Sequence, residues 1–370
     1  MKKKIAFVLV SPSPYGLNRI SELNKYSEFE LYLFFEFSKS LSKEDWSIKS
    51  LKNCTIEIIN SFLINKKTFM TMPYKLPFLI YKYKPDIVIT SNAKQSVFCL
   101  PLRLMLNFKV GIVVEDSLHA VKTTNPINNM FKTIIYRSAD FYLPFSKDAI
   151  KYLKSIKIRK PMYPASWSID LDHFKNADLC KISRIKKEFN TEDKLVFLTV
   201  ARLDSGKGII NYLSAINKMP SDILDNLIFL IIGSGPQKEE LELFIKKHNL
   251  ENVYLLGYKI YEEIVNYYHA ADVFVLPTLK DLFSLVVMEA MACGLPVLTT
   301  IYNGARELIR EGENGYIFDS ANIEDIKKVL VKVYKNRDKL KEMGSVSLEI
   351  IKEYSHEKVM KNLKIILEQI

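Results

Sequence analysis

The sequence has few residues of the kinds that hold metals or cross-link loops. Its four cysteines, Cys54, Cys99, Cys180 and Cys293, lie far apart and show none of the paired spacings of zinc sites or redox motifs. The five histidines are equally dispersed. We therefore expect no metal site and no cofactor. We also expect reduced thiols in a reducing compartment, which predicts a cytoplasmic protein.

Long apolar runs are also missing. No run reaches the roughly 18 residues that a membrane-spanning helix needs; the apolar stretch at 97–108, for example, contains Arg103. The apolar part of the N-terminus covers only residues 5–10 and runs into Pro12 and Pro14. A signal peptide needs an apolar region of about 7 to 15 residues and a small-residue cleavage site. We interpret this segment as a first strand.

Acidic residues are outnumbered, with 42 Asp and Glu against 53 Lys and Arg, a net charge of +11. This balance favours anionic partners. The sequence has no zinc-finger spacing, basic zipper or aromatic RNA-binding signature, so we expect no nucleic acid. Residues 149–169 combine five bases with Tyr152, Tyr163 and Trp167 and contain no acid. This mixture predicts peripheral contact with the anionic inner face of the cytoplasmic membrane. An ordinary solvated face is the alternative.

The length of 370 residues is suited to two domains of ordinary size. Short apolar runs typical of buried strands recur in both halves, at 5–10, 29–35, 55–59, 86–90, 109–114, 141–143, 195–200, 227–232, 252–257, 272–277 and 295–300. Helical patterns lie between them in the first half, at 69–82, 94–106 and 127–138. Such alternation predicts an α/β fold with doubly wound parallel sheets, whose ligands bind at the carboxyl ends of the strands.

The segment 281–300 holds two carboxylates close to the start of a helix. Ser284 is a suitable N-cap, and the following helix ends at Gly294 in the C-cap position. Asp281 precedes this helix and Glu289 lies in its second turn. A helix N-terminus binds anions, and flanking carboxylates accept hydroxyl groups, so the combination predicts a nucleotide-sugar site. The alternative is a capped core helix with one acidic surface residue.

Asp281, seven further residues and Glu289, followed by Ala-Met-Ala-Cys-Gly-Leu-Pro-Val, resemble the acidic signature of glycosyltransferase family 4 and its retaining GT-B relatives. That signature ordinarily has glutamate at both ends, whereas this chain begins with the shorter Asp281. The resemblance implies that Glu289 accepts the ribose hydroxyls and that Asp281 accepts the hydroxyls of the donor sugar. It also places N–H groups around Phe283, Ser284 and Leu285 against the diphosphate.

A second part of the resemblance follows the strand expected at 195–200. Arg202 and, five residues later, Lys207 have the spacing of the family's phosphate loop. The resemblance implies that they stabilise the departing nucleoside diphosphate, as preorganised cations do. The alternative is two surface charges in a glycine-rich loop.

The family also has a Gly-x-Gly-Pro segment between its phosphate loop and its acidic signature. Gly233 and Gly235 match it, although such a pair is weak on its own because many tight turns contain it. The resemblance further places Tyr258 near the nucleobase. Ordinary packing is the alternative for this tyrosine.

The first half of the chain matches the family less closely. Gly16 lies in the expected first strand-to-helix loop, which in the family faces the donor diphosphate across the cleft; a proline-rich turn is the alternative. His119 follows the strand expected at 109–114, where related enzymes place a histidine against the transferred sugar or the acceptor. Glu115 and Asp116 are competing candidates for the acceptor contact, and the sequence does not choose between them.

The resemblance implies a GT-B fold, in which two Rossmann-like domains face each other across a cleft. We expect an acceptor-binding domain at 1–175, a linker at 176–193 and a nucleotide-sugar domain at 194–354. The helix at 355–370 is expected to pack back onto the first domain. A hinge is expected at Asp170 or Asp172 and Phe174.

The function implied is that of a retaining, metal-independent glycosyltransferase of the hexosyl- or N-acetylhexosaminyltransferase class. The donor expected is a nucleoside-diphosphate sugar, with uridine as the base. The acceptor expected is a glycan or lipid-linked glycan of the bacterial surface, of the lipopolysaccharide, capsule or teichoic acid type. Two alternatives stay open: a GT-B sugar-nucleotide 2-epimerase, and a catalytically silent nucleotide-sugar-binding subunit.

Overall fold

The computed structural model describes residues 2–12, 14–37, 54–59, 61–65, 70–103, 105–116 and 126–370. The chain forms two compact units. The first unit contains Met1–Ser168 and His356–Ile370, and the second contains Ile169–Ser355. The last helix thus belongs to the same unit as the N-terminus. The segment 169–175, predicted as the end of the first domain, belongs to the second unit.

The first unit is built on a parallel sheet with the strand order β3-β2-β1-β6-β7-β8 and has an added antiparallel hairpin of β4 and β5. Its described elements, in chain order, are β1 (Lys3–Leu9), α1 (Pro14–Leu23), β2 (Phe29–Phe35), β3 (Cys54–Ile58), β4 (Phe62–Asn65), β5 (Met70–Met72), α2 (Leu76–Tyr83), β6 (Ile87–Thr90), α3 (Ala93–Val97), α4 (Leu100–Arg103), β7 (Lys109–Val114), α6 (Pro126–Ser138), β8 (Phe141–Pro144), α7 (Lys147–Ser155) and α17 (His356–Gln369).

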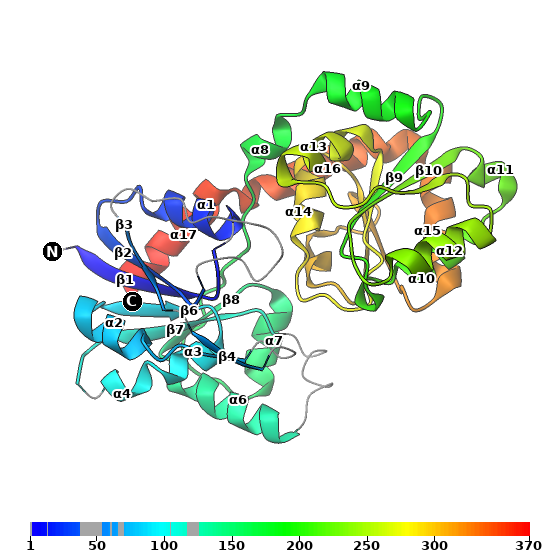
Figure 1. Ribbon diagram of the computed structural model, residues 1–370. Helices are drawn as coiled ribbons and strands as arrows, with labels where there is room; N and C mark the ends of the chain where they lie inside the picture. Colours follow the sequence, from blue (N-terminus) through cyan, green and yellow to red (C-terminus); the bar gives the residue numbers. More distant parts are fainter. Residues whose placement is uncertain are drawn as a thin grey trace. The chain divides into compact units, whose positions relative to one another are not determined.

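Alternating residues of β1 supply both faces of this sheet, because successive side chains of a strand point to opposite sides. Ile5 and Phe7 belong to a core cluster with residues of α1 and α17, whereas Ala6 and Val8 belong to a second cluster with residues of α2. Figure 1 shows α17, in red, beside α1, in blue. The C-terminal helix therefore contributes to the same core as the first strand.

The second unit has a parallel sheet with the strand order β11-β10-β9-β12-β13-β14. Its elements, in chain order, are α8 (Leu171–Lys175), α9 (Leu179–Glu188), β9 (Leu195–Val200), η1 (Ser205–Lys207), α10 (Ile209–Asn217), α11 (Ser221–Leu224), β10 (Leu227–Ile232), α12 (Lys238–Lys247), β11 (Val253–Leu255), α13 (Tyr261–Ala270), β12 (Val273–Val275), α14 (Leu285–Ala292), β13 (Val297–Thr300), η2 (Gly304–Leu308), β14 (Gly315–Phe318), α15 (Ile323–Lys335), η3 (Arg337–Lys339), α16 (Leu340–Ile351) and η4 (Lys352–Tyr354).

Buried apolar residues form the large core of this second unit. Phe197 of β9 and Phe229 of β10 stack with their ring centroids 5.2 Å apart. They share a cluster with Leu213 of α10, Leu241 of α12 and Leu330 of α15, so these helices cover one face of the sheet. Helices α13 and α14 contact β9 and β13, respectively. This packing of helices on the sheet holds the strands in place, and with them the loops at the strand ends.

The structure corrects several element boundaries of the first unit. The segment expected as one helix at 69–82 contains strand β5, then Pro73, and only then helix α2. The helix expected at 94–106 is divided into α3 and α4, with Pro101 in the first turn of the second piece. Proline has no N–H group and is compatible with a helix start but not with a helix interior, which explains both breaks.

The segment expected as hinge and linker is part of the second unit. Asp170 caps α8 by accepting a hydrogen bond from the N–H of His173 at 3.1 Å, and Phe174 is fully buried. Helix α9 packs against α13, and the N–H of Asp178 donates to Oδ1 of Asn266 at 2.8 Å. Among the helices of the described residues, none combines the length and the apolar character needed to cross a bilayer.

Candidate functional site

The predicted phosphate loop and acidic loop meet at the centre of the second sheet. From β9 the chain proceeds to β10 and β11 on one side, and it then returns to β12 on the other side of β9. The loops that follow β9 and β12 therefore start at the carboxyl ends of two neighbouring strands and lead to opposite sides of the sheet. Such a point, where the strand order reverses at the carboxyl edge of a parallel sheet, is where ligands bind in open α/β folds.

The loop after β9 is rigid because its own side chains and glycines fix it. Asp204 accepts a hydrogen bond from the N–H of Gly206 at 2.9 Å and so caps the short helix η1. Gly208 has a φ of 64°, and a Cβ atom there would lie 2.2 Å from the carbonyl oxygen of Pro277. Thr278 donates its hydroxyl to the carbonyl of Gly206 at 3.0 Å. These contacts hold the backbone of the loop directly against the segment that follows β12.

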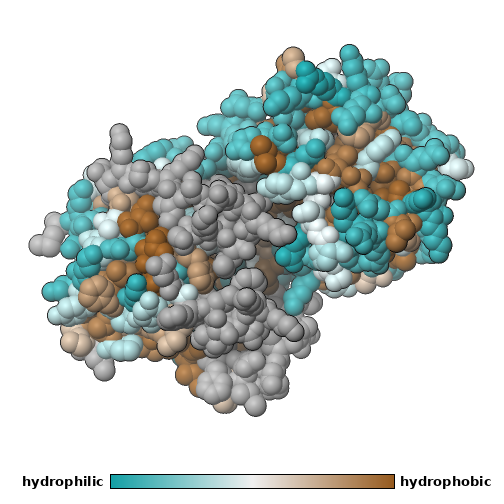
Figure 2. All heavy atoms as spheres, viewed as in Figure 1, coloured by the Kyte–Doolittle hydropathy of each residue, from teal (hydrophilic) through white to brown (hydrophobic). Residues whose placement is uncertain are grey.

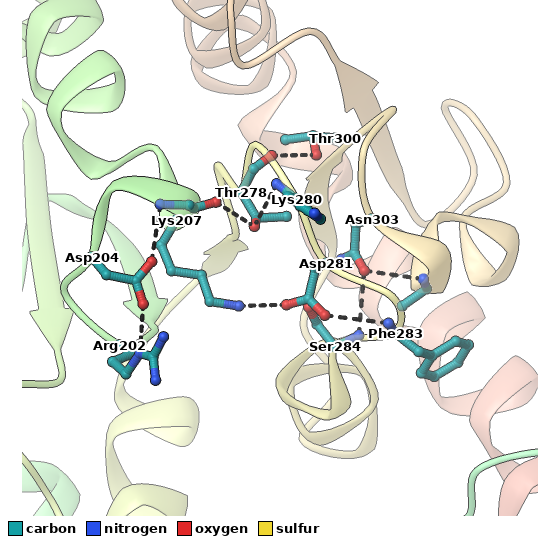
Figure 3. A network of polar contacts seen from close by, with 12 residues as sticks. Arg202, Asp204, Lys207, Thr278, Lys280, Asp281, Phe283, Ser284, Thr300 and Asn303 are labelled. Carbon is teal, nitrogen blue, oxygen red and sulfur yellow. Dashed lines mark hydrogen bonds and ion pairs between the residues drawn. The ribbon is translucent and has the colours of Figure 1, made fainter. Parts of the chain in front are cut away.

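Lys207 and Asp281 form an ion pair between the two loops. The Nζ atom of Lys207 lies 2.5 Å from Oδ2 of Asp281, and the two side chains are 22% and 17% exposed (Figure 3). A pair this well covered is screened by water much less than a surface pair. The structure therefore brings together two of the predicted site residues from separate motifs, in a place where their charges act strongly.

Hydrogen bonds hold both the side chain and the backbone of Asp281. Its Oδ1 atom accepts a hydrogen bond from the N–H of Phe283 at 3.2 Å. Its backbone N–H donates to the carbonyl of Tyr302 at 3.1 Å, and its carbonyl accepts from the N–H of Gly304 at 3.2 Å. A Cβ atom on Gly304 would lie 1.8 Å from the carbonyl oxygen of Leu282, so only glycine allows this approach. The carboxylate is thus preorganised.

Asn303 organises the start of helix α14, a role that the sequence analysis did not assign. Its side chain is fully buried, and its Oδ1 accepts hydrogen bonds from the N–H groups of Ser284 at 3.3 Å and Ala305 at 3.1 Å. Its Nδ2 donates to Oγ1 of Thr299 at 2.8 Å. The available signal was an Asn-Gly pair that follows a buried strand after two further residues, which is typical of a turn.

Ser284 occupies the N-cap position of α14, as predicted, but its side chain forms no capping hydrogen bond. The residue is only 6% exposed, and its Oγ atom has no hydrogen-bond partner within the described part of the chain. A buried hydroxyl without a partner is costly. Because the first N–H groups of a helix also lack partners inside the helix, this hydroxyl adds one donor to a helix end where we predict that an anion binds. The N–H groups of Phe283 and Ser284, in contrast, are already engaged by Asp281 and Asn303.

Arg202 joins the same polar network at its exposed edge. Its Nε atom lies 2.5 Å from Oδ2 of Asp204, and its side chain is 76% exposed (Figure 3). Asp204 therefore connects the arginine with the loop that carries Lys207. Because the guanidinium is largely in water, this pair itself adds little stability.

Glu289 is buried on the inner side of α14. It is 4% exposed, and its Oε2 atom accepts a hydrogen bond from the hydroxyl of Tyr268 on α13 at 2.8 Å. The neighbouring Cys293 has its pKa raised well above the usual range, by burial first and by the charge of Glu289 second. The tyrosine thus supports one oxygen of this carboxylate.

The predicted glycines 233 and 235 pack against the phosphate loop. Gly233 has a φ of 148°, and a Cβ atom there would lie 1.8 Å from the carbonyl oxygen of Ala201. A Cβ atom on Gly235 would lie 2.3 Å from the carbonyl oxygen of Leu203. Tyr258 follows β11 and is 51% exposed, so it is not a core residue. The two glycines therefore set the position of the backbone on either side of Arg202.

Comparisons with known proteins show the family of this chain. A family model described as glycosyl transferases group 1 matches residues 181–347. The N-acetylgalactosamine-N,N'-diacetylbacillosaminyl-diphospho-undecaprenol 4-alpha-N-acetylgalactosaminyltransferase of Campylobacter jejuni is 30% identical over 296 residues, which are 72% of this chain and 76% of that protein. The chain belongs to the glycosyl transferases group 1 family.

Two further comparisons extend over nearly the whole glycosyltransferase chain. An uncharacterized glycosyltransferase of Methanocaldococcus jannaschii is 25% identical over 371 residues, covering 95% of this chain and 94% of that protein. The solved structure of HepE from Anabaena in complex with UDP superimposes with a TM-score of 0.80 at 17% identity, covering 100% of both chains. The predicted GT-B fold is confirmed.

In the first unit of this glycosyltransferase, helix α1 begins at Pro14, three residues before the start at Leu17 that a loop at Gly16 requires, so Gly16 lies in the first turn of the helix. The prediction that Gly16 sits in a strand-to-helix loop is therefore wrong. His119 lies outside the described residues. Within those residues, no group of three His, Cys, Asp or Glu side chains is placed to hold a metal ion.

The two acids after β7 have different surroundings. Asp116 accepts a hydrogen bond at Oδ2 from the hydroxyl of Tyr136 at 2.6 Å. Glu115 faces Arg19 of α1, and burial raises its pKa to about 7, against the opposing effect of Arg19. The Arg19 guanidinium lies over the rings of Phe145, at 5.0 Å, and Trp167, at 5.5 Å. This arrangement of an acid, a cation and aromatic rings stands at the carboxyl edge of the first sheet, where ligands of such sheets bind.

Proposed function

We propose that this protein is a retaining glycosyltransferase that moves a hexosyl or N-acetylhexosaminyl group from a UDP-sugar to a glycan of the bacterial surface. The acceptor would be of the lipopolysaccharide, capsule or teichoic acid type. The observation that carries the proposal is the ion pair of Lys207 and Asp281 at the point where the order of the second sheet reverses. This pair places a cation and a carboxylate beside the start of α14.

Lys207 and Arg202 would stabilise the leaving group. When the bond between the anomeric carbon and the β-phosphate oxygen breaks, the electron pair leaves with the diphosphate, and its charge grows. A cation that is already in position stabilises that charge without reorganisation, and one such contact contributes on the order of 3 kcal/mol. Asp281 holds the ammonium group of Lys207 in place beforehand. The Oγ donor of Ser284 supports the same anion.

Retention follows if the acceptor hydroxyl attacks on the face from which the diphosphate departs. Its oxygen forms the new bond to the anomeric carbon, and its proton passes to the leaving phosphate oxygen. The phosphate then acts as the base, and no nucleophile from the protein is needed. Asp281 would accept hydroxyl groups of the donor sugar, and Glu289, supported by Tyr268, would accept those of the ribose.

The comparisons support the choice of donor and acceptor. HepE was solved with UDP bound, and the C. jejuni relative is named for an acceptor carried on diphospho-undecaprenol, a lipid. We therefore place the enzyme in the cytoplasm, at the inner face of the cytoplasmic membrane. The net charge of +11 suits both a diphosphate donor and an anionic surface.

A thermal-shift panel of nucleoside-diphosphate sugars tests the donor class. A ligand present at 100 times its dissociation constant adds about 2.7 kcal/mol to the stability of the protein that binds it. We expect UDP and one UDP-sugar to raise the unfolding temperature, and we expect other nucleotides to have a smaller effect. If no nucleoside diphosphate shifts the transition, the proposal is wrong.

The donor that binds then serves in a second assay. Incubation with a glycan acceptor should give a product whose anomeric proton coupling, measured by NMR, equals that of the donor. An inverted configuration would exclude the retaining mechanism. An altered sugar in the absence of acceptor would show an epimerase instead.

A further inference from the structure

Helices α2, α3, α4 and α6 cover part of one side of the first unit, and their charges are all of one sign. They contain no Asp or Glu, and their bases are Lys82, Lys94, Arg103, Lys132 and Arg137. Helices α12 and α15 of the second unit instead mix acids with bases, as solvated helices commonly do. The layer formed by the four helices is therefore positively charged.

The same layer exposes large apolar side chains. Phe78 (66%) and Tyr81 (53%) of α2 and Met130 (57%) and Ile134 (56%) of α6 expose more than half of their surface, and so does Met105 (71%), which follows α4. Residues three or four positions apart lie on the same side of a helix, so each of α2 and α6 presents an apolar stripe. Figure 2 shows apolar residues at the surface of this unit, among hydrophilic ones.

Helix α2 is apolar on both sides. Its inner residues Leu76, Leu79 and Ile80 are buried against the sheet, while Phe78 and Tyr81 face outwards. A helix that is apolar all round is ordinarily covered on all sides. Because α2 contacts α4, α3 contacts α6, and α4 directly follows α3 in the chain, the exposed residues lie on or beside one series of neighbouring helices. An exposed apolar surface of this kind marks an interaction site.

Exposed bases lie on or beside the same helices. Lys75, Lys84 and Lys94 are exposed and form no ion pair with any described residue. Lys82 pairs with Glu57 at 2.9 Å, and Arg103 pairs with Asp140 at 2.7 Å, so those two charges are already matched. A second copy of this chain is a poor partner for the surface, because it would bring like charges together.

The segment 149–169, where the sequence predicted membrane contact, exposes its basic residues but not its aromatic ones. Its bases are exposed, but Tyr152 is buried in a core cluster, and Tyr163 and Trp167 pack against the core beneath the first sheet. The aromatic residues of that segment are therefore structural. Exposed apolar side chains occur on the helical layer instead, together with bases that pair with no described residue.

We propose that an apolar-basic face, formed by Phe78, Tyr81, Met105, Met130 and Ile134 with Lys75, Lys84 and Lys94, binds the surface of an anionic bilayer. The apolar side chains enter the boundary between headgroups and acyl chains, and the lysines attract anionic lipid. The binding itself is independent of the proposed function. Its purpose rests on that function, because a lipid-linked acceptor would be presented at this surface.

Co-sedimentation of the full chain with vesicles tests the proposal. We expect binding to phosphatidylcholine vesicles that contain phosphatidylglycerol and much weaker binding to pure phosphatidylcholine. Each lysine near such a surface contributes roughly a fivefold gain in affinity, so Lys75→Ala, Lys84→Ala and Lys94→Ala combined should weaken binding about a hundredfold. The pair Phe78→Ser and Tyr81→Ser should weaken it at least tenfold, because burial of an apolar side chain is lost.

Matched controls come from elsewhere in the chain. Leu179→Ser with Leu243→Ser removes two apolar side chains of the second unit that are 80% and 68% exposed, and this pair should leave vesicle binding unchanged. The UDP-induced thermal shift should be the same in all variants, which separates this test from that of the proposed function. Vesicle binding that survives the Phe78 and Tyr81 changes, or that depends only on Lys154, Lys157 and Arg159, would overturn the proposal. So would concentration-dependent dimerisation that the same changes abolish.

Discussion

The Nζ atom of Lys207 lies 2.5 Å from Oδ2 of Asp281, although 74 positions separate the two residues in the chain. One comes from the loop after β9 and the other from the loop after β12, and these strands are neighbours in the sheet. The pair holds a cation and a carboxylate in fixed positions beside the first turn of α14. In the proposed function, the cation contacts the diphosphate of the donor and the carboxylate contacts its sugar.

Replacement of the lysine should impair turnover far more than folding. We expect Lys207→Ala to lower kcat about a hundredfold, because one preorganised contact to the leaving diphosphate is lost. Steady-state kinetics measure the effect, and circular dichroism checks the fold. The matched control is Lys238→Ala, on the exposed surface of α12, which should leave kcat unchanged. Equal turnover of the wild type and Lys207→Ala would refute the phosphate role.

The carboxylate of Asp281 should be needed for its charge. In Asp281→Asn the side chain can still accept the N–H of Phe283, but its attraction for Lys207 is lost. A hydrogen bond to a charged group contributes about 1.5 to 3 kcal/mol, so we expect kcat/KM to fall by roughly ten- to a hundredfold. Asp281→Glu keeps the charge and should retain more activity than Asp281→Asn. If Asp281→Asn were more active than Asp281→Glu, the length of the side chain, and not its charge, would determine activity.

The glycines of the second unit offer a test of how tightly its loops are packed. Gly233→Ala places a Cβ atom 1.8 Å from the carbonyl oxygen of Ala201, so the phosphate loop must shift. We expect a loss of about 2 to 4 kcal/mol, or a fall of roughly 5 to 15 °C in Tm measured by scanning calorimetry. Gly312→Ala is the control, because its φ of 80° is also positive but the space around it is open.

That control should cost only about 1 to 2 kcal/mol, the strain of a left-handed backbone alone. If both variants lose the same stability, the close contact between Gly233 and Ala201 is not what constrains this loop. The affinity for UDP, measured on the same proteins, should fall only for Gly233→Ala.

The fold class could be predicted because short apolar runs typical of buried strands recur along the chain. The runs at 195–200, 227–232 and 295–300 correspond closely to β9, β10 and β13. The hairpin of β4 and β5 was missed, since its residues form no alternating pattern long enough to recognise. The division of the helix expected at 94–106 was also missed, although Pro101 could have indicated it.

The site was predictable only as separate motifs. The spacing of Arg202 and Lys207 and that of Asp281 and Glu289 could be recognised, but no local pattern shows that Lys207 contacts Asp281. That contact depends on which strands are neighbours, which is a property of the whole sheet. The same reason explains why Asn303 was missed, because its partners Ser284 and Thr299 come from different segments.

Glu115 gives the first unit a pH dependence with a definite sign. Burial raises the pKa of its carboxyl group from 4.5 to about 7, while Arg19 opposes the shift and Asp116 adds to it. A carboxyl group whose pKa is raised in the folded state stabilises the fold fully below pH 4.5. That contribution is lost as the pH rises towards 7, because the folded protein must then hold a charge in a desolvated place. Its size is on the order of 1 to 3 kcal/mol.

The variant Glu115→Gln should remove this dependence, because an amide does not ionise. Both tryptophans, Trp46 and Trp167, belong to the sequence of the first unit, so urea unfolding followed by tryptophan fluorescence reports on that unit. From pH 5 to pH 8 the wild type should lose stability relative to Glu115→Gln, whereas Asp116→Asn should not reproduce this relative change. If the wild type and Glu115→Gln lose stability in parallel, the effect of burial on the pKa of Glu115 is offset by the electrostatic attraction of Arg19.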